Sequence, residues 1–209
     1  MTEIAYLYVL NTMADWEPSY LIAELNSGRY FRTNATGYTV RTVGITKKPV
    51  VTMGGLRIDP DVSLDELTTD DAGVLILPGG ETWLEDIHTP ILEKAKEFLD
   101  AGITVAAICG ATLGLAKAGL LDNRLHTSND LGYLKTVCPD YTGESLYRQE
   151  PAVTDGNLIT ASGIAPLEFA KEVIRKLDVF SDQTLEAWYQ LYVTHEMQYF
   201  YAIMESLEE

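Results

Sequence analysis

Three short apolar runs restrict the fold of this chain more than any other feature of its sequence. They cover residues 4–10, 73–77 and 103–108, and small or polar residues follow each of them. A continuous apolar run of this length is typical of a strand that is covered on both faces, as in a parallel sheet. Segments with helical spacing lie between the runs. The sequence therefore predicts a mainly parallel sheet with helices on both faces.

The remaining segments complete the predicted order of elements. Helices are expected over residues 18–26, 90–99, 166–177 and from the residues after Cys109 to Ala118, with a weaker one over residues 131–137. A further strand is expected over residues 38–45. Two hairpins are expected, over residues 49–58 around Gly54-Gly55 and over residues 152–161 around Asp155-Gly156.

The last part of the chain differs from the rest in its aromatic content. Residues 181–209 contain Trp188, Tyr189, Tyr192, Tyr199, Phe200 and Tyr201. Ser181 or Asp182 is suited to cap a helix there. Because no linker precedes this segment, we expect one domain over residues 1–180 and an aromatic helical C-terminal extension over residues 181–209 that packs on it. Its aromatic side chains serve either as core packing or a dimer face, or as a lid over a substrate pocket.

Charge and composition exclude several classes of partner. The chain has 31 acidic and 15 basic residues and a net charge of −16, so its surface repels nucleic acid and anionic membranes. No run of about 18 apolar residues is present, and the N-terminus does not resemble a signal peptide. Two cysteines are too few for a disulfide framework. We therefore expect a cytoplasmic protein without a nucleic-acid or membrane partner.

Neither a metal nor a cofactor is expected. No group of His, Cys and Asp residues has the spacing of a metal site. Gly79-Gly80 lacks the further glycines of a dinucleotide-binding motif.

Cys109 lies where an apolar strand runs directly into a helix rich in small residues. The segment ITVAAICGATLGLAKAGLL has the pattern of a nucleophile elbow, in which Gly110 permits the tight turn. The helix N-terminus favours a thiolate, and its backbone N–H groups can stabilise an oxyanion. The alternative is a buried structural cysteine, which is the commonest role of an unpaired Cys.

Two glycines and a carboxyl group are expected at the same edge of the sheet, where ligands of parallel sheets bind. Gly79 and Gly80 follow the strand over residues 73–77, and glycine lets the main chain approach a ligand closely. Glu17 lies in a predicted loop beside Trp16, where desolvation raises the pKa of a carboxyl group and suits it to proton transfer. The alternatives are an ordinary turn and an acidic residue that the dipole of a following helix favours.

Together these motifs resemble the PfpI superfamily, which is related to the class I glutamine amidotransferases. That group includes intracellular cysteine peptidases and the parkinsonism-associated deglycase, and the chain is most similar to bacterial proteins described as intracellular proteases or amidases. The resemblance covers about residues 3–178 and rests on Glu17 after the first strand, LPGG, AAICGATxGLAxAGLL, TSN and DGNLITASG with APLEFA. It implies a flavodoxin-like three-layer α/β sandwich.

The resemblance also implies a role for each matched residue. Cys109 takes the position of the nucleophile, and Glu17 that of a protonated glutamate that hydrogen-bonds the thiolate. Gly80 and Gly110 would supply the amides of an oxyanion hole, with Gly79 in the same turn.

Two histidines of the superfamily have no counterpart in this chain. The peptidase branch has histidine after the cysteine, where this chain has Gly110, and the amidotransferase branch has His-x-Glu where residues 164–168 contain no histidine. Neither triad transfers directly, and the thiol lacks its usual base. His126, just before the TSN motif, is a candidate partner for the thiol, and Ser128 and Asn129 are candidate substrate-binding residues.

The sequence is compatible with three functions. In the first, Cys109 attacks a small-molecule carbonyl or amide substrate, Glu17 donates and accepts the proton, and the protein is a cysteine-dependent hydrolase or a glyoxalase-like lyase. The lack of an adjacent histidine favours aldehyde chemistry over proteolysis. The second is a redox-responsive stress protein with an oxidisable Cys109. The third is a non-catalytic binding module. We expect a homodimer.

Overall fold

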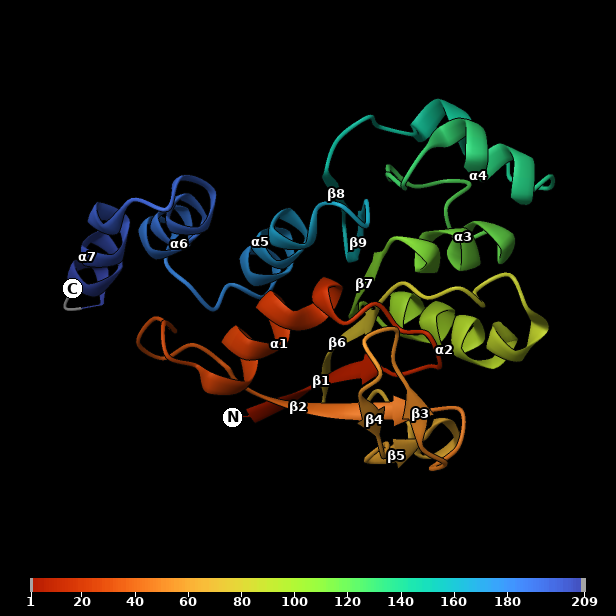
Figure 1. The fold of residues 1–209 in the computed structure, drawn as a ribbon, viewed down its shortest axis with the longest axis horizontal. Coiled ribbons are helices and arrows are strands. Elements are labelled where there is room, and N and C mark those ends of the chain that lie inside the picture. Colours follow the sequence, from red (N-terminus) through yellow and green to blue (C-terminus); the bar gives the residue numbers. More distant parts are fainter. Residues whose placement is uncertain (1, 208–209) are drawn as a thin grey trace.

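A seven-stranded sheet forms the centre of the computed structural model, which describes residues 2–207 (Figure 1). The strand order is β5-β2-β1-β6-β7-β9-β8. Its strands are β1 (Thr2–Tyr8), β2 (Gly37–Gly44), β5 (Val62–Ser63), β6 (Ala72–Leu77), β7 (Thr104–Ile108), β8 (Ala152–Asp155) and β9 (Leu158–Ala161). Neighbouring strands pair in parallel, except that β8 and β9 are antiparallel. The three apolar runs thus form β1, β6 and β7, in the middle of the sheet.

Helices cover both faces of this sheet, as the continuous apolar runs predicted. Figure 1 shows α1 (Trp16–Ser27) and α5 (Pro166–Leu177) on one face and α2 (Thr89–Asp100) and α3 (Gly110–Lys117) on the other. All five residues of β7 are buried because it lies between these two layers. The fold is therefore a flavodoxin-like three-layer α/β sandwich with a mainly parallel sheet, as expected.

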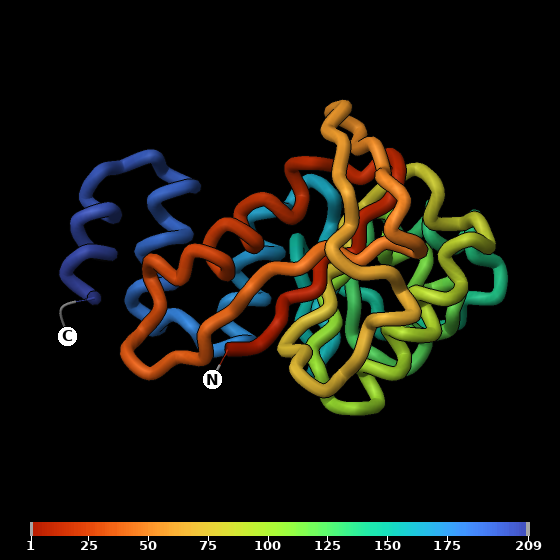
Figure 2. The backbone as a smooth tube through the Cα atoms, turned by 90° about the horizontal axis from the view of Figure 1, so that it is seen from below, coloured from red at the N-terminus to blue at the C-terminus, as the bar shows by residue number. Residues whose placement is uncertain are grey.

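The short elements lie around this sandwich. They are the hairpin strands β3 (Val50–Val51) and β4 (Arg57–Ile58), the helix α4 (Leu131–Val137) and the 3₁₀ turns η1 (Leu64–Glu66), η2 (Asp86–His88) and η3 (Glu144–Leu146). Both predicted hairpins are present, and the β3–β4 hairpin projects from the body of the molecule (Figure 2). Asp15 holds it, accepting hydrogen bonds from Thr52 Oγ1 at 2.5 Å and from the Gly54 N–H at 2.6 Å.

Two details differ from the sequence prediction. Strand β5 was not predicted, because it has only two residues and so shows no periodicity. Helix α1 begins at Trp16, before Pro18, because proline is tolerated in the first turn of a helix. Glu17 therefore lies in the first turn of α1 and not in a loop.

The C-terminal extension forms two helices, α6 (Asp182–Thr194) and α7 (Met197–Ser206), at one end of the molecule (Figures 1 and 2). Of the two predicted caps, Ser181 is the one present: its Oγ accepts the Thr184 N–H at 3.1 Å at the start of α6. Within residues 2–207, no helix has both the length and the apolar character needed to cross a membrane.

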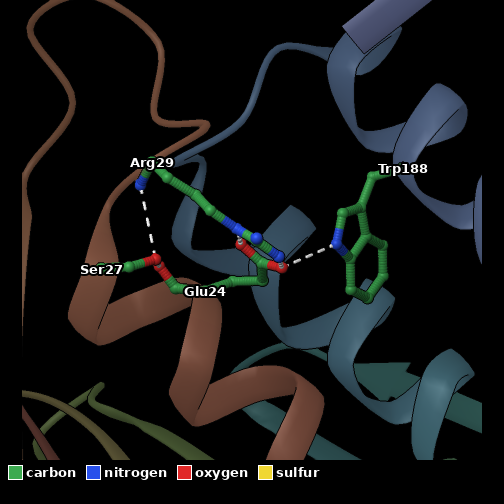
Figure 3. Close-up of polar contacts among 4 residues, drawn as sticks. All are labelled: Glu24, Ser27, Arg29 and Trp188. Carbon is green, nitrogen blue, oxygen red and sulfur yellow. Dashed lines mark hydrogen bonds and ion pairs between the residues drawn. The ribbon is translucent and has the colours of Figure 1, made fainter. Parts of the chain in front are cut away.

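Trp188 attaches the extension to the domain. Its indole is fully buried, and its Nε1 donates to Glu24 Oε1 of α1 at 3.0 Å (Figure 3). Glu24 is 2% exposed, and Arg29 pairs with the same carboxylate. A buried charge is tolerated when it is paired and hydrogen-bonded, so these contacts fix α6 against α1. Trp188 thus acts as core packing, one of the two roles expected for the aromatic side chains.

Candidate active site

Cys109 connects β7 to α3 in a backbone conformation that is rare for a residue with a side chain. Its φ is 60° and its ψ is −124°. Such a conformation costs of order 1–3 kcal/mol and persists only where the surroundings fix it. Here the Cys109 N–H donates to the Ala161 carbonyl at 3.0 Å, and Thr112 Oγ1 donates to the Cys109 carbonyl at 2.6 Å. The strand–turn–helix elbow predicted from the sequence is therefore present, and its cysteine is partly exposed.

Glu17 lies beside this thiol and is fully buried. Its Oε2 accepts the backbone N–H of Gly79 at 2.5 Å, whereas Oε1 has no hydrogen-bond partner among residues 2–207. A Cβ placed on Gly163 would lie 2.6 Å from Cys109 Sγ and 3.1 Å from Glu17 Oε1, so both atoms border the same small space. An unpaired buried oxygen is costly, and a proton shared with the thiol or with a ligand would satisfy it.

The two groups shift each other's pKa. Burial raises the pKa of Glu17 to about 7, opposed in part by the hydrogen bond from Gly79 and by the neighbouring Cys109 thiol. Burial also raises the pKa of Cys109 to about 11, and the Glu17 carboxylate adds to this rise. Hydrogen bonds from Asn129 and Gly110 act in the opposite direction. Among the described residues, Glu17 is the one ionisable side chain that shifts the pKa of Cys109.

The pKa of Cys109 is raised, whereas the sequence predicts that the N-terminus of the following helix favours the thiolate and so lowers this pKa. A helix terminus contributes only about 0.3–1 kcal/mol at an exposed site, whereas burial is the largest influence on Cys109. At neutral pH the site therefore holds a protonated thiol beside a carboxyl group that titrates near neutrality.

Three glycines bring the turn after β6 against the start of α3. A Cβ on Gly79 would lie 2.6 Å from Glu17 Oε2, and one on Gly110 would lie 2.7 Å from the carbonyl oxygen of Gly80. The Gly79 amide is bonded to Glu17 and so is not available to a ligand. The Gly80 amide has no acceptor within residues 2–207, and Gly110, as the first residue of α3, has no intrahelical acceptor for its N–H.

Asn129 joins the thiol to the loop after β9. Its Nδ2 donates to Cys109 Sγ at 3.3 Å, and its Oδ1 accepts the Gly163 N–H at 2.8 Å. The Gly163 carbonyl in turn accepts the indole N–H of Trp16 at 3.3 Å. Sequence reasoning named Asn129 but not Gly163. The available signal was that the ASG segment follows a strand, and so ends at the same edge of the sheet as Cys109.

Ser128 and His126, two further candidates, have partners away from the thiol. Ser128 is buried, and its Oγ bonds Thr112 Oγ1 at 2.7 Å, so it supports the elbow through Thr112. His126 is fully buried, with Nδ1 at 2.7 Å from the Arg124 carbonyl and Nε2 at 2.6 Å from Tyr141 Oη. Both ring nitrogens are engaged, and neither contacts Cys109.

The other two histidines are also engaged elsewhere or exposed. His88 is buried between Tyr8 Oη and Thr82 Oγ1, each at 2.8 Å from a ring nitrogen. His195 ends helix α6 at the surface. Glu17 is therefore the proton acceptor that the described part of the chain places beside the thiol.

A cavity of about 360 Å³ opens next to Asn129, and we call it the side pocket. It is lined by Ser128, Asn129, Gln149, Glu150, Pro151, Ser162, Ile164, Ala165 and Glu168. Ile164 is 94% exposed at its rim. Among the described residues no group of three or more His, Cys, Asp or Glu side chains is arranged to hold a metal ion.

Known proteins resemble the chain over its whole length. The "Uncharacterized protease YoaZ" of Bacillus subtilis is 58% identical over 206 residues, covering 99% of this chain and 98% of that protein. The crystal structure of a ThiJ/PfpI family protein from Bacillus anthracis is 57% identical, with a TM-score of 0.96 over 100% of this chain and 99% of that one.

More distant relatives have names that include an activity. The "Glutathione-independent glyoxalase DJR-1.2" of Caenorhabditis elegans is 26% identical over 68% of this chain and 75% of its own length. The "Deglycase PfpI" of Pyrococcus furiosus is 29% identical over 47% of this chain and 60% of its own length. The model of the DJ-1/PfpI family matches residues 3–176. The resemblance inferred from the sequence motifs is thereby confirmed, and the chain belongs to the DJ-1/PfpI family.

Proposed function

We propose that this protein is an enzyme in which Cys109 adds to the carbonyl carbon of a small aldehyde and Glu17 moves the protons. The observation that carries the proposal is Glu17 Oε1, a buried carboxyl oxygen beside the thiol that has no hydrogen-bond partner among residues 2–207. A carboxyl group with a pKa near the working pH is the best general acid and base. The rise in the pKa of Glu17 to about 7 meets that condition.

The addition step needs only these two side chains. As the sulfur of Cys109 bonds to the carbonyl carbon, the thiol proton passes to the Glu17 carboxylate and the π electrons move to oxygen. The oxyanion then takes the proton from Glu17, which leaves a neutral hemithioacetal. The amides of Gly80 and Gly110 are the proposed donors to the oxyanion, because the Gly80 N–H has no acceptor in the described chain and the Gly110 N–H lies at the start of α3 beside the Cys109 sulfur.

With a 2-oxoaldehyde the same groups can complete a reaction. Glu17 removes the proton from the former aldehyde carbon, and the neighbouring carbonyl oxygen takes up a proton, which gives an enediol. Glu17 then returns a proton to the neighbouring carbon, and the hydroxyl group on the former aldehyde carbon loses its proton and becomes the carbonyl group of a 2-hydroxy acid thioester. Water then cleaves the thioester and regenerates the thiol. The sum is 2-oxoaldehyde plus water to 2-hydroxy acid, with no external oxidant or reductant.

The site supports this chemistry better than peptide hydrolysis. Cleavage of an amide requires an acid to protonate the leaving amine, a role that histidine commonly fills. No histidine contacts Cys109 among residues 2–207. Aldehyde addition has no amine leaving group and needs only the proton shuttle that Glu17 offers.

Methylglyoxal provides a direct test. The purified protein should form lactate, Cys109→Ser should form none above background, and Cys138→Ser should retain activity because Cys138 is a buried cysteine bonded to the Leu113 carbonyl. Thermal unfolding would verify that each variant is folded. Lactate formation that is absent in the parent protein, or equal in Cys109→Ser, would overturn the proposal.

A redox sensor is a less well supported alternative. Sensor cysteines are exposed thiols with a low pKa. Burial raises the pKa of Cys109, so little thiolate is present at neutral pH.

A further inference from the structure

Two glutamates line the side pocket, and Asn129 connects it to the thiol. Glu150 and Glu168 are among its lining residues, and within the described chain no lysine, arginine or histidine lines it. Asn129, which donates to Cys109 Sγ, is part of the same lining. A molecule whose carbonyl group reaches Cys109 therefore has the side pocket available for its other end.

Glu168 is held in place from the C-terminal extension. Tyr189 of α6 donates its hydroxyl to Glu168 Oε1 at 2.8 Å, and this bond is the main reason that the pKa of Tyr189 rises to about 12. Oε2 of Glu168 has no hydrogen-bond partner among residues 2–207. Tyr189 therefore orients the carboxylate while leaving one of its oxygens open to a ligand.

Lys171, three residues after Glu168 on α5, has its partners on α6. Lys171 Nζ lies 3.8 Å from the centre of the Tyr189 ring and pairs with Glu186 Oε2 at 2.8 Å. It packs on Tyr189, and among residues 2–207 it forms no ion pair with Glu168. The backbone of Glu150, the other lining glutamate, is fixed where its carbonyl accepts the Thr127 hydroxyl at 2.8 Å.

We propose that the side pocket binds an ammonium or guanidinium group of the substrate while the substrate's carbonyl carbon lies at Cys109. The inference rests on the function proposed above, and it narrows the substrate to a carbonyl compound with a cationic end. Its basis is the cavity of about 360 Å³, which is large enough for such a group, together with the open oxygen of Glu168 and the lack of a lining cation. Tyr189 is a positioning residue for this site.

Two thiol reagents of the same shape but different charge test the pocket without requiring turnover. The cationic reagent is 2-(trimethylammonio)ethyl methanethiosulfonate, and its uncharged 3,3-dimethylbutyl analogue has nearly the same shape. Each transfers its thioalkyl group to the Cys109 sulfur, and methanesulfinate leaves. The ratio of the two labelling rates, followed by intact mass, reports cation preference at the thiol. Cys109→Ser establishes which cysteine is labelled.

Because the net charge of −16 favours any cation, the preference must be compared with that of a control variant that loses the same charge. Glu93→Gln serves as this control, since Glu93 is exposed on α2 and does not line the side pocket. We expect Glu168→Gln to lower the cationic-to-neutral rate ratio about two- to fivefold relative to Glu93→Gln, as for a single ion pair. Glu150→Gln should act in the same direction.

The variant Tyr189→Phe distinguishes orientation of Glu168 from general destabilisation. It should lower the rate ratio while the rate with the neutral reagent stays unchanged, and Glu168→Asp should recover part of the preference. A ratio that is the same in Glu168→Gln and Glu93→Gln would overturn the pocket assignment, yet leave the reactive thiol and the proposed function intact. Failure of every reagent to label Cys109 would overturn both.

Discussion

Gly79 donates its backbone N–H to Glu17 Oε2 at 2.5 Å, and this bond turns the other oxygen of the carboxyl group toward the space beside Cys109. The turn after β6 therefore holds the Glu17 carboxyl group through Oε2. Among residues 2–207 it leaves Oε1 without a hydrogen-bond partner, so that this oxygen can bind a proton or a ligand. Since a side chain on Gly79 would clash with the carboxyl oxygens, the arrangement depends on glycine at that position.

Replacing Glu17 by glutamine should lower the pKa of Cys109. The Glu17 carboxylate raises that pKa, and a neutral amide removes the negative charge that opposes thiolate formation. The rate of iodoacetamide alkylation measured against pH should show its transition at a lower pH in Glu17→Gln than in the parent protein. Turnover of methylglyoxal should nevertheless fall by about 10²–10⁴, because the proton carrier is lost. An unchanged or higher transition would contradict the assigned contact.

Activity should follow the ionisation of Glu17. The proposed base is the carboxylate and its pKa is about 7, so kcat/KM should rise with pH to a plateau above that value. Measurement of lactate formation between about pH 5 and pH 9 checks this, with a constant buffer mixture. A profile that shows no inflection near neutrality would exclude Glu17 as the base.

The same ionisation should make folding stability depend on pH. Burial raises the pKa of Glu17 from 4.5 to about 7, so between these values the native state binds more protons than the unfolded state. The free energy of unfolding should therefore be highest below pH 4.5, and it should fall by about 3 kcal/mol as the pH rises from 4.5 through about 7. Urea unfolding should show this decline in the parent protein and not in Glu17→Gln. Parallel curves for the two proteins would contradict the shift.

Gly163→Ala should block the thiol. A Cβ at this position would lie 2.6 Å from Cys109 Sγ and 2.8 Å from its Cβ, so the elbow or the loop after β9 must move. We expect a loss of stability of about 1–3 kcal/mol, as for overpacking elsewhere, and slower alkylation of Cys109. Gly132→Ala in α4 is the control, because a Cβ there meets only Asp130 Oδ1, at 3.2 Å. Equal alkylation rates in the two variants would show that Gly163 does not border the thiol.

The fold was predictable because its signals are local. Helix α5 has the predicted bounds, because proline starts it and its buried side chains recur at helical spacing. Cys109 was predictable for the same reason, since an apolar strand, a cysteine and small residues follow one another directly. Glu17 was expected at the same edge of the sheet as Cys109 because each follows a parallel strand, and the family resemblance added the specific pairing of the two side chains.

The parts of the site that were missed depend on packing between distant segments. The raised pKa of Cys109 arises from burial, which no local pattern reports. Gly163 faces the thiol across the sheet edge, and Tyr189 reaches Glu168 from a separate helix. Such contacts follow from how helices and loops pack, and a single sequence contains no periodicity that indicates them.

The attachment of the C-terminal extension should depend on the bond between Trp188 and Glu24. Trp188→Phe keeps a ring in the core but removes the N–H that donates to the buried carboxylate at 3.0 Å. The free energy of unfolding should fall by about 1–3 kcal/mol, the cost of leaving a buried acceptor short of a partner.

In the double variant with Glu24→Gln, the losses of unfolding free energy from the two substitutions should be less than additive, because each removes the same interaction. Urea unfolding of both single variants and the double variant measures this, with Tyr201→Phe as the control because Tyr201 is 62% exposed. Full additivity would mean that Trp188 stabilises the extension through its ring alone.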